Sequence, residues 1–193
     1  MVKLIGSKKV KTAVFISGNG SNLKSLIEFS RKKNSPILIN LIISNNLKSR
    51  GLKFAKIFKI RKKIFNSKDK FLTEKKILLE LKRNKIKLIC LAGFMKILSK
   101  NFIEKFRGKI LNIHPSLLPK FKGLNTHMRA IKNNEKYSGC TVHFVNSKLD
   151  SGKIILQKKV KISKNETSHS LAKKILIQEH KLYPQAILKI FNL

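Results

Sequence analysis

Short apolar runs alternate with segments of helical spacing along most of this chain, and no other feature limits its possible folds as strongly. Residues 11–17 (KTAVFIS) and 36–44 (PILINLIIS) are rich in Val, Ile and Phe and are bounded by turn residues, as buried strands are. Apolar residues recur at helical spacing in residues 21–33 between them, with Ser21 or Asn22 placed to cap the helix. This part of the chain is therefore predicted to form a β-α-β unit.

The alternation continues through the middle of the chain. Further strands are expected at residues 86–92 and 110–114, and further helices at 70–84 and 99–106. Strands that alternate with helices are typical of a mostly parallel sheet with helices on both faces. Past Gly139 the pattern changes to two strands joined around the turn SKLDSGK, followed by a long helix from about Glu166. We therefore predict a three-layer, Rossmann-like α/β fold with an antiparallel C-terminal strand region.

Length and composition suit one globular domain over residues 1–193. The apolar fraction of 42% is near the globular norm, and 193 residues can bury a sizeable core. Cys90 and Cys140 lie far apart in apolar surroundings, which indicates buried thiols in a reducing, cytoplasmic compartment. The first apolar run breaks at Gly18 and no later run reaches about 18 apolar residues, so neither export nor membrane spanning is expected.

The charge is the most unusual bulk property. With 44 Lys and Arg against 9 Asp and Glu, the formal net charge is +35, which would attract any polyanion. The lysines are spread over the whole chain, however, and the basic runs lack interleaved aromatic groups and an RNA-recognition signature. We interpret the charge as compositional drift toward A/T-rich codons and expect no specific nucleic-acid partner. A basic RNA-binding protein without catalysis is the alternative.

Ligands of such sheets bind beyond the carboxyl ends of the strands, so the loops after strands are the first places to search. The loop after the first strand consists of Gly18, Asn19, Gly20, Ser21 and Asn22. Its glycines let a ligand approach the backbone, and the following helix offers free N–H groups to an anion. A dinucleotide is disfavoured because Leu23 replaces the third glycine of the G-x-G-x-x-G pattern. We expect a phosphate monoester here; a tight turn with a capping serine is the structural alternative.

Asn112 and His114 stand two residues apart at the end of a predicted strand, so both side chains point to one face of the sheet. Pro115 ends the strand directly afterwards. An amide donor and an imidazole that converge on one point can stabilise an oxyanion, and the imidazole can also move a proton near neutral pH. This chemistry suits acyl transfer to a nucleophile that belongs to the substrate. A buried core histidine beside a capping asparagine explains the segment equally well.

Six segments of the chain occur in an order known from one enzyme family. They are FISGNGSNL, LAGFMKIL, LNIHPSLLPKFKGL, VHFV, LDSGKIILQ and QEHKLYP. In these segments the chain resembles the phosphoribosylglycinamide formyltransferases, folate-dependent enzymes of purine synthesis, over nearly its whole length. The resemblance implies the formyltransferase type of α/β sheet and transfer of a formyl group from 10-formyltetrahydrofolate to the amine of glycinamide ribonucleotide.

The resemblance also implies a catalytic trio. Asn112, His114 and Asp150 match the Asn, His and Asp that the family uses. Asn112 and a protonated His114 would stabilise the oxyanion, and Asp150 would hold the imidazolium and help to pass the proton. Without the resemblance, Asp150 would be interpreted as a turn residue of the Asx type.

Substrate contacts follow from the same resemblance. The loop from Gly18 to Asn22 would grip the ribonucleotide phosphate, and Glu179 would meet the glycine amine or the ribose; a solvated helix face is the alternative for Glu179. The folate slot would be lined by Met95, Lys96, Ile97 and Leu98, with His143 facing the site. From residue type alone, Met95 would belong to the core and His143 would be a buried, hydrogen-bonded histidine. The remaining histidines show no ligand spacing, so no metal is expected.

By this resemblance residues 1–110 form a phosphate-binding half and residues 86–193 a folate-binding and catalytic half of one domain. The partners would be the two small-molecule substrates, with the chain as monomer or homodimer. Three residues depart from the family pattern and leave substrate contacts open, namely Lys122, Asn125 and Lys153. Methionyl-tRNA formyltransferase and formyltetrahydrofolate hydrolase are the alternatives within the folate enzymes. Both carry a further domain for which this chain has no residues left, and we therefore expect neither.

Overall fold

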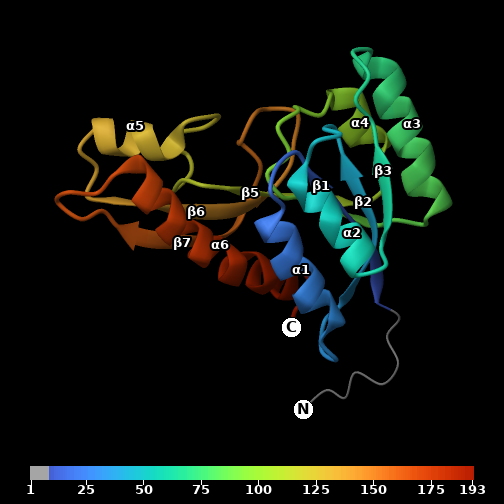
Figure 1. Ribbon diagram of the computed structural model, residues 1–193, viewed down its shortest axis with the longest axis horizontal. Coiled ribbons are helices and arrows are strands. Elements are labelled where there is room, and N and C mark those ends of the chain that lie inside the picture. The colour runs from blue at the N-terminus through green and yellow to red at the C-terminus, as the bar shows by residue number, and fades with distance from the viewer. Residues whose placement is uncertain (1–8) are drawn as a thin grey trace.

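The computed structural model describes residues 9–193, so the first eight residues of the predicted domain lie outside the described part. Within it, seven strands form one sheet in the order β3-β2-β1-β4-β5-β6-β7 (Figure 1). The strands are β1 (Val10–Ile16), β2 (Ile37–Ser44), β3 (Arg61–Ile64), β4 (Leu88–Leu91), β5 (Lys109–His114), β6 (Tyr137–Phe144) and β7 (Ile154–Lys161). The pairs up to β5 are parallel, and β6 and β7 run antiparallel to their neighbours. The predicted mixed sheet is confirmed.

Helices connect and cover these strands. They are α1 (Ser21–Arg31), η1 (Arg50–Leu52), α2 (Lys53–Ile57), α3 (Lys70–Arg83), α4 (Lys100–Lys105), α5 (Thr126–Lys132) and α6 (Ser168–Ile190). The prediction that Ser21 or Asn22 caps the first helix is wrong, because α1 begins at Ser21 and Gly20 occupies the cap position at φ 74°. Sequence patterns did not indicate α2, β3 or α5, which are short.

The core has two layers, one on each face of the sheet. Alternate residues of β1 divide between them: Val14 and Ile16 pack with α1, α2 and α6, whereas Ala13 and Phe15 pack with α3 and α4. Figure 1 shows α1 and α6 beside each other over one face, with α3 and α4 covering the sheet from the other side. The three-layer arrangement therefore follows from strands that are apolar on both sides.

The strand order has a topological switch point at β1. This strand pairs with β2 on one side and with β4 on the other, because the chain builds β2 and β3 first and then returns across β1 to β4. Loops after β1 and β4 leave the sheet in different directions at such a switch point, and ligands bind in the space between them. The loop from Gly18 to Asn22 follows β1, and residues 93–98 follow β4, so both candidate substrate segments border this edge.

Both outer strands of the sheet carry exposed basic side chains. Arg61, Lys62 and Lys63 are exposed on β3, and Lys158, Lys159 and Lys161 are exposed on β7. These strands have a single pairing partner each, β2 and β6. Cys90 and Cys140 are buried in the interior as free thiols, as predicted. In the described part of the chain, no helix combines the length and apolar character needed to cross a membrane.

Candidate active site

A cavity of about 700 Å³ is bordered by the carboxyl ends of β4 and β5, by α6 and by the loops between them. Most residues that we singled out from the sequence line it, namely Asn22, Met95, Lys96, Ile97, Leu98, Asn112, His114, His143, Asp150 and Glu179. Gly18, Asn19, Gly20 and Ser21 do not line this cavity and instead form the turn that leads into Asn22. The structure therefore gathers the trio, the 93–98 segment and the end of the glycine loop around one space.

Asn112 and His114 occupy the last part of β5. Their side chains point to the face of the sheet away from α6, because the intervening Leu111 and Ile113 pack in the core cluster that contains α6. The register places Asn112 opposite His143 of β6. Two strands thus hold an amide and two imidazoles close together, as strand alternation predicted for the residues of β5.

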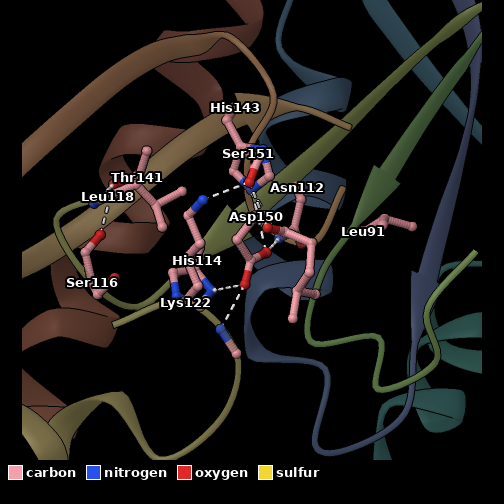
Figure 2. A network of polar contacts seen from close by, with 12 residues as sticks. Leu91, Asn112, His114, Ser116, Leu118, Lys122, Thr141, His143, Asp150 and Ser151 are labelled. Atoms are coloured by element: carbon pink, nitrogen blue, oxygen red, sulfur yellow. Dashed lines mark hydrogen bonds and ion pairs between the residues drawn. The ribbon is translucent and has the colours of Figure 1, made fainter. Parts of the chain in front are cut away.

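Asp150 reaches this group from the turn between β6 and β7. Its backbone is left-handed, with φ 44°, and the nearby Gly152 packs directly against the main chain of Phe144. A Cβ on Gly152 would lie 1.7 Å from the carbonyl oxygen of Phe144, so no other residue fits this approach. The turn places Asp150 Oδ2 3.4 Å from Nδ1 of His114 and within 2.9 Å of the Gly123 N–H, which donates to it (Figure 2).

Both ring nitrogens of His114 face acceptors. Nε2 donates to the carbonyl of Phe121 at 2.9 Å, and Nδ1 faces the carboxylate of Asp150. A neutral imidazole has a single N–H, so only the imidazolium can donate on both sides. The side chains of His114 and Asp150 are 6% and 8% exposed, and water screens a buried pair weakly. Both ring nitrogens of His114 therefore lie against acceptors in a setting with little access to water.

The Phe121 carbonyl, which accepts from His114, belongs to a loop that is itself held by hydrogen bonds. Thr141 of β6 donates to the carbonyl of Ser116 at 2.6 Å and accepts from the N–H of Leu118 at 3.1 Å (Figure 2). Phe121 follows in the left-handed conformation, with φ 54°, which is uncommon for a bulky residue. Strained backbone of this kind persists only where surrounding contacts fix it. The segment after β5 therefore fixes the carbonyl to which His114 donates.

His143 fixes the direction of the Asn112 amide. Burial lowers the pKa of His143 from its ordinary value, although its hydrogen bond to Phe144 and the charge of Asp150 oppose the shift, so the ring is neutral near pH 7. Its Nδ1 donates to the carbonyl of Phe144 at 2.8 Å, which leaves Nε2 as an acceptor for Asn112 Nδ2 at 3.2 Å. The second N–H of Asn112 has only a 3.5 Å contact with Asp150 Oδ1 and remains available to another acceptor.

The glycine loop is shaped by close backbone contact with η1. A Cβ on Gly20, which has φ 74°, would lie 2.7 Å from Cα of Gly51, and Gly18 has open space beside it. The Gly18 carbonyl accepts hydrogen bonds from Ser49 Oγ at 2.7 Å and from the N–H of Gly51 at 3.0 Å. The first N–H groups of α1 have no carbonyl partner within the helix. An anion bound at this helix start would meet those N–H groups and the positive end of the helix dipole.

Glu179 is a buried residue of α6, which excludes the solvated face considered above. Only 6% of it is exposed, and its Oε2 accepts a 2.6 Å hydrogen bond from Asn22 Nδ2. Burial raises the pKa of Glu179 to about 7, and the Asn22 hydrogen bond offsets this in part. The pair connects the glycine loop to α6 and places a titratable carboxyl group at the wall of the cavity.

The 93–98 segment forms another wall. Met95 and Ile97 are 63% and 61% exposed, whereas Leu98 is buried. Interpreting Met95 as a core residue would therefore have been wrong. Exposed apolar side chains beside a cavity offer a surface for a flat, partly apolar ligand.

Some cavity residues were not assigned to the site from the sequence. His169 and Lys173 of α6 line the cavity, and Lys148 adds a further cation from the β6–β7 turn. His169 and Lys173 are spaced by one helical turn and so share a face of α6, and this spacing was the signal that could have grouped them. Among residues 9–193, no three His, Cys, Asp or Glu side chains are grouped so that they could hold a metal ion.

The three departures from the family pattern lie around this site. Lys122 Nζ donates to Ser151 Oγ at 2.6 Å, next to the Asp150 turn (Figure 2). Asn125 has φ 57° at the start of α5 and lines the cavity. Lys153 contributes its backbone carbonyl, which accepts from the Phe144 N–H at 2.9 Å.

Comparisons with known proteins agree with this geometry. Residues 10–187 match the family model described as formyl transferase. The chain belongs to the formyl transferase family. A human trifunctional purine biosynthetic protein, adenosine-3, is 43% identical over 93% of the chain, and the phosphoribosylglycinamide formyltransferase of Haemophilus influenzae is 42% identical over 92% of it. The crystal structure of phosphoribosylglycinamide formyltransferase from Brucella melitensis superposes with a TM-score of 0.89 at 41% identity, covering 95% of this chain and 96% of that one.

Relative lengths differ between these proteins. This formyl transferase spans 18% of the human trifunctional protein but 85% of the Haemophilus influenzae enzyme. The similarity therefore concerns one part of the longer relatives. The structural match confirms the predicted formyltransferase type of sheet, with its antiparallel C-terminal strands.

Proposed function

We propose that this formyl transferase moves a formyl group from 10-formyltetrahydrofolate to the amine of glycinamide ribonucleotide, in purine biosynthesis. One observation carries the proposal. Asn112, His114 and Asp150 converge on the same cavity that Asn22 and Glu179 line, beside a glycine turn at a helix start. Oxyanion chemistry and an anion-binding turn thus lie together, as transfer to a phosphorylated amine requires. The relatives named phosphoribosylglycinamide formyltransferase support this choice of substrate.

The ribonucleotide would bind from the glycine loop toward the trio. Its phosphate would accept hydrogen bonds from the N–H groups at the start of α1, in the loop from Gly18 to Asn22. Glu179 is hydrogen-bonded to Asn22 at the end of this loop and would then lie near the ribose or the glycine amine. An ionised or a neutral Glu179 can accept a hydrogen bond from either group.

The folate would occupy the wall formed by residues 93–98. Met95, Ile97 and Leu98 present apolar surface, and the exposed backbone of the segment offers hydrogen-bonding groups to a pterin. Lys96, Lys148 and Lys173 surround the same cavity and give it positive charge. Both proposed substrates are anions, one through its phosphate and one through its glutamate carboxylates, so this charge favours their binding.

The reaction would use hydrogen-bond donors that are only loosely engaged. Nδ1 of His114 lies 3.4 Å and Nδ2 of Asn112 lies 3.5 Å from Asp150, and catalytic hydrogen bonds are often this long before substrate binds. The uncharged substrate amine attacks the formyl carbon, and the carbonyl electron pair moves onto oxygen. Asn112 and the His114 imidazolium then donate to the resulting oxyanion and lower the barrier.

Collapse of the tetrahedral intermediate completes the transfer. The bond from the formyl carbon to the folate nitrogen breaks, and this nitrogen takes up the proton that the amine loses. Asp150 keeps His114 charged throughout and, with a water molecule, relays that proton. The position of Asp150 suits this proton relay. Its Oδ2 accepts a hydrogen bond from the Gly123 N–H, and its Oδ1 faces Asn112.

The domain division belongs to the same proposal. Residues up to about 110 would bind the phosphate, and residues from about 86 onward would bind folate and catalyse the transfer. Two buried free thiols suit the reducing cytoplasm as the place of the reaction.

An absorbance assay for tetrahydrofolate formation tests the activity. The purified chain is mixed with 10-formyltetrahydrofolate and one of three acceptors: glycinamide ribonucleotide, methionyl-tRNA, or water alone. We expect turnover with glycinamide ribonucleotide only. Turnover with methionyl-tRNA or with water at a comparable rate would replace the proposed acceptor. RNA retention without any formyl transfer would instead favour a basic binding protein, and it would weaken steeply as salt rises.

A further inference from the structure

Ser17 uses every polar group it has to join the ends of three strands. It follows β1, and its N–H donates to the carbonyl of Gly93 at 3.1 Å. Its Oγ accepts from the N–H of Met95 at 2.8 Å and donates to Oδ1 of Asn45. Its carbonyl accepts from Nδ2 of Asn46 at 3.1 Å. A half-buried serine thus connects the loop after β1 to the loops after β2 and β4.

The two connected segments are those proposed to bind different substrates. Ser17 directly precedes Gly18 of the glycine loop, and its hydroxyl holds the backbone of Met95 in the middle of residues 93–98. The glycine loop has further support, because Ser49 and Gly51 hold the Gly18 carbonyl. The 93–98 segment is exposed at Met95 and Ile97, so the tie to Ser17 matters more for its position.

The far end of the 93–98 segment is anchored separately. Glu74 of α3 accepts from the backbone N–H of Ser99 at 2.8 Å and also from its hydroxyl. Ser99 Oγ accepts from the N–H of Phe102 and so caps α4. Glu74 is buried, and its hydrogen bonds to Ser99 do not depend on Ser17. Loss of the Ser17 contact would therefore free the middle of the segment without unfolding its end.

We propose that Ser17 is a positioning residue that couples the two substrate sites. An occupied glycine loop fixes the main chain at Ser17, and the Ser17 hydroxyl then holds residues 93–98 in the form that binds folate. The inference rests on the proposed function, since it assigns the ribonucleotide to one segment and the folate to the other. Coupling of this kind is reciprocal, so each substrate must raise the affinity of the other by the same factor.

The Ser17→Ala variant tests the proposal. It leaves the Met95 N–H and the Asn45 side chain without their shared partner. We expect the KM for 10-formyltetrahydrofolate to rise about tenfold, in line with the loss of one or two neutral hydrogen bonds. The KM for glycinamide ribonucleotide should rise about threefold or less, because Ser49 and Gly51 still support its loop. The kcat should stay within about threefold, since the catalytic trio is untouched.

A binding measurement reads the coupling directly. Calorimetric titration of wild type with tetrahydrofolate, alone and with saturating glycinamide ribonucleotide, should show several-fold tighter binding in the second case. Titration in the reverse order should give the same factor. In Ser17→Ala both titrations should give a factor near one. Asn45→Ala serves as a second variant, because it removes the acceptor that orients the Ser17 hydroxyl, and it should shift the coupling in the same direction.

Ser25→Ala is the matched control. Ser25 is also half-buried, and its hydroxyl donates to a backbone carbonyl, that of His180, at 2.9 Å, but it connects α1 to α6 and not the two substrate segments. It should lose similar stability and keep the coupling. An active wild type with unchanged KM and coupling in Ser17→Ala, or an equal loss in Ser25→Ala, would overturn the proposal. A wild type without formyl transfer would instead defeat the function on which it rests.

Discussion

The Asp150 carboxylate lies 3.4 Å from Nδ1 of His114, while the opposite ring nitrogen donates to the carbonyl of Phe121. Three chain segments meet in this relationship: the end of β5, the loop that follows it, and the β6–β7 turn. Both side chains are largely hidden from water, so removing one partner leaves the polar atoms of the other without their contact. The contact between Asp150 and His114 is therefore a property of the folded chain and depends on the turn that carries Asp150.

Replacing either His114 or Asp150 should greatly reduce the rate of catalysis while the protein stays folded. For His114→Ala and Asp150→Asn we expect kcat to fall at least about a hundredfold, because one oxyanion donor is lost or uncharged. Tetrahydrofolate formation measures the rate, and far-ultraviolet circular dichroism checks the fold. Near-normal turnover in either variant would remove the trio from the mechanism.

Two glycines of one loop should differ strongly in their tolerance of an added methyl group. Gly20→Ala places a Cβ 2.7 Å from Cα of Gly51 at φ 74°, so the free energy of unfolding should drop by about 2 kcal/mol or more. Gly18→Ala meets nothing within 4 Å, and its stability should change by less than about 1 kcal/mol. Urea unfolding of both variants beside wild type gives the comparison. Equal losses would show that η1 does not pack on the loop as described.

Gly152→Ala should damage both stability and rate. The added Cβ would lie 1.7 Å from the Phe144 carbonyl oxygen, which is backbone, so the β6–β7 turn must move and take Asp150 with it. We expect kcat/KM to fall at least about tenfold, because small misplacements of catalytic groups are costly. Lys153→Ala, at an exposed neighbouring position, is the control and should keep the rate. Unaltered kinetics in Gly152→Ala would contradict the link between turn shape and catalysis.

Glu179 should make stability fall as the solution becomes more alkaline. Its folded pKa of about 7 lies above the ordinary value of 4.5, so the folded chain binds more protons than the unfolded chain between these values. The contribution of Glu179 to the free energy of unfolding is therefore highest below pH 4.5 and decreases as pH rises through about 7. Glu179→Gln cannot ionise and should gain stability relative to wild type by about 3 kcal/mol between pH 4.5 and pH 8.

Thermal unfolding of both proteins at several pH values measures this difference. The comparison cancels the effect of the large net charge, which both proteins share. A difference that stays constant with pH would mean that folding does not raise the pKa of Glu179, in spite of its burial.

Most of the sheet could be predicted because its strands contain short apolar runs, which in the central strands are buried on both faces. The strand that was missed is β3, whose residues Arg61–Ile64 have no apolar pattern and are held through main-chain pairing with β2. The prediction of the residue that caps α1 was wrong because a tertiary contact decides it. Sequence rules favour Ser21 or Asn22, but the close approach of Gly51 places Gly20 at that position.

The site residues also divide into those that local sequence patterns predict and those that depend on tertiary contacts. Strand alternation alone placed Asn112 and His114 on one face, because both lie in one element. Family resemblance was needed for Asp150, since its approach depends on the antiparallel pairing of β6 and on the tight turn at Gly152. His169 and Lys173 remained unassigned because their position relative to β5 is a tertiary property of α6.

The exposed lysines and arginines of β3 and β7 also matter for the chain in crowded solution. An unpaired sheet edge can accept a strand from a second copy, and such stacking leads to fibres. Here both edges present like charges, so two copies repel each other where their backbones would otherwise join. The basic side chains of the two outer strands thus oppose edge-to-edge stacking of copies of the chain.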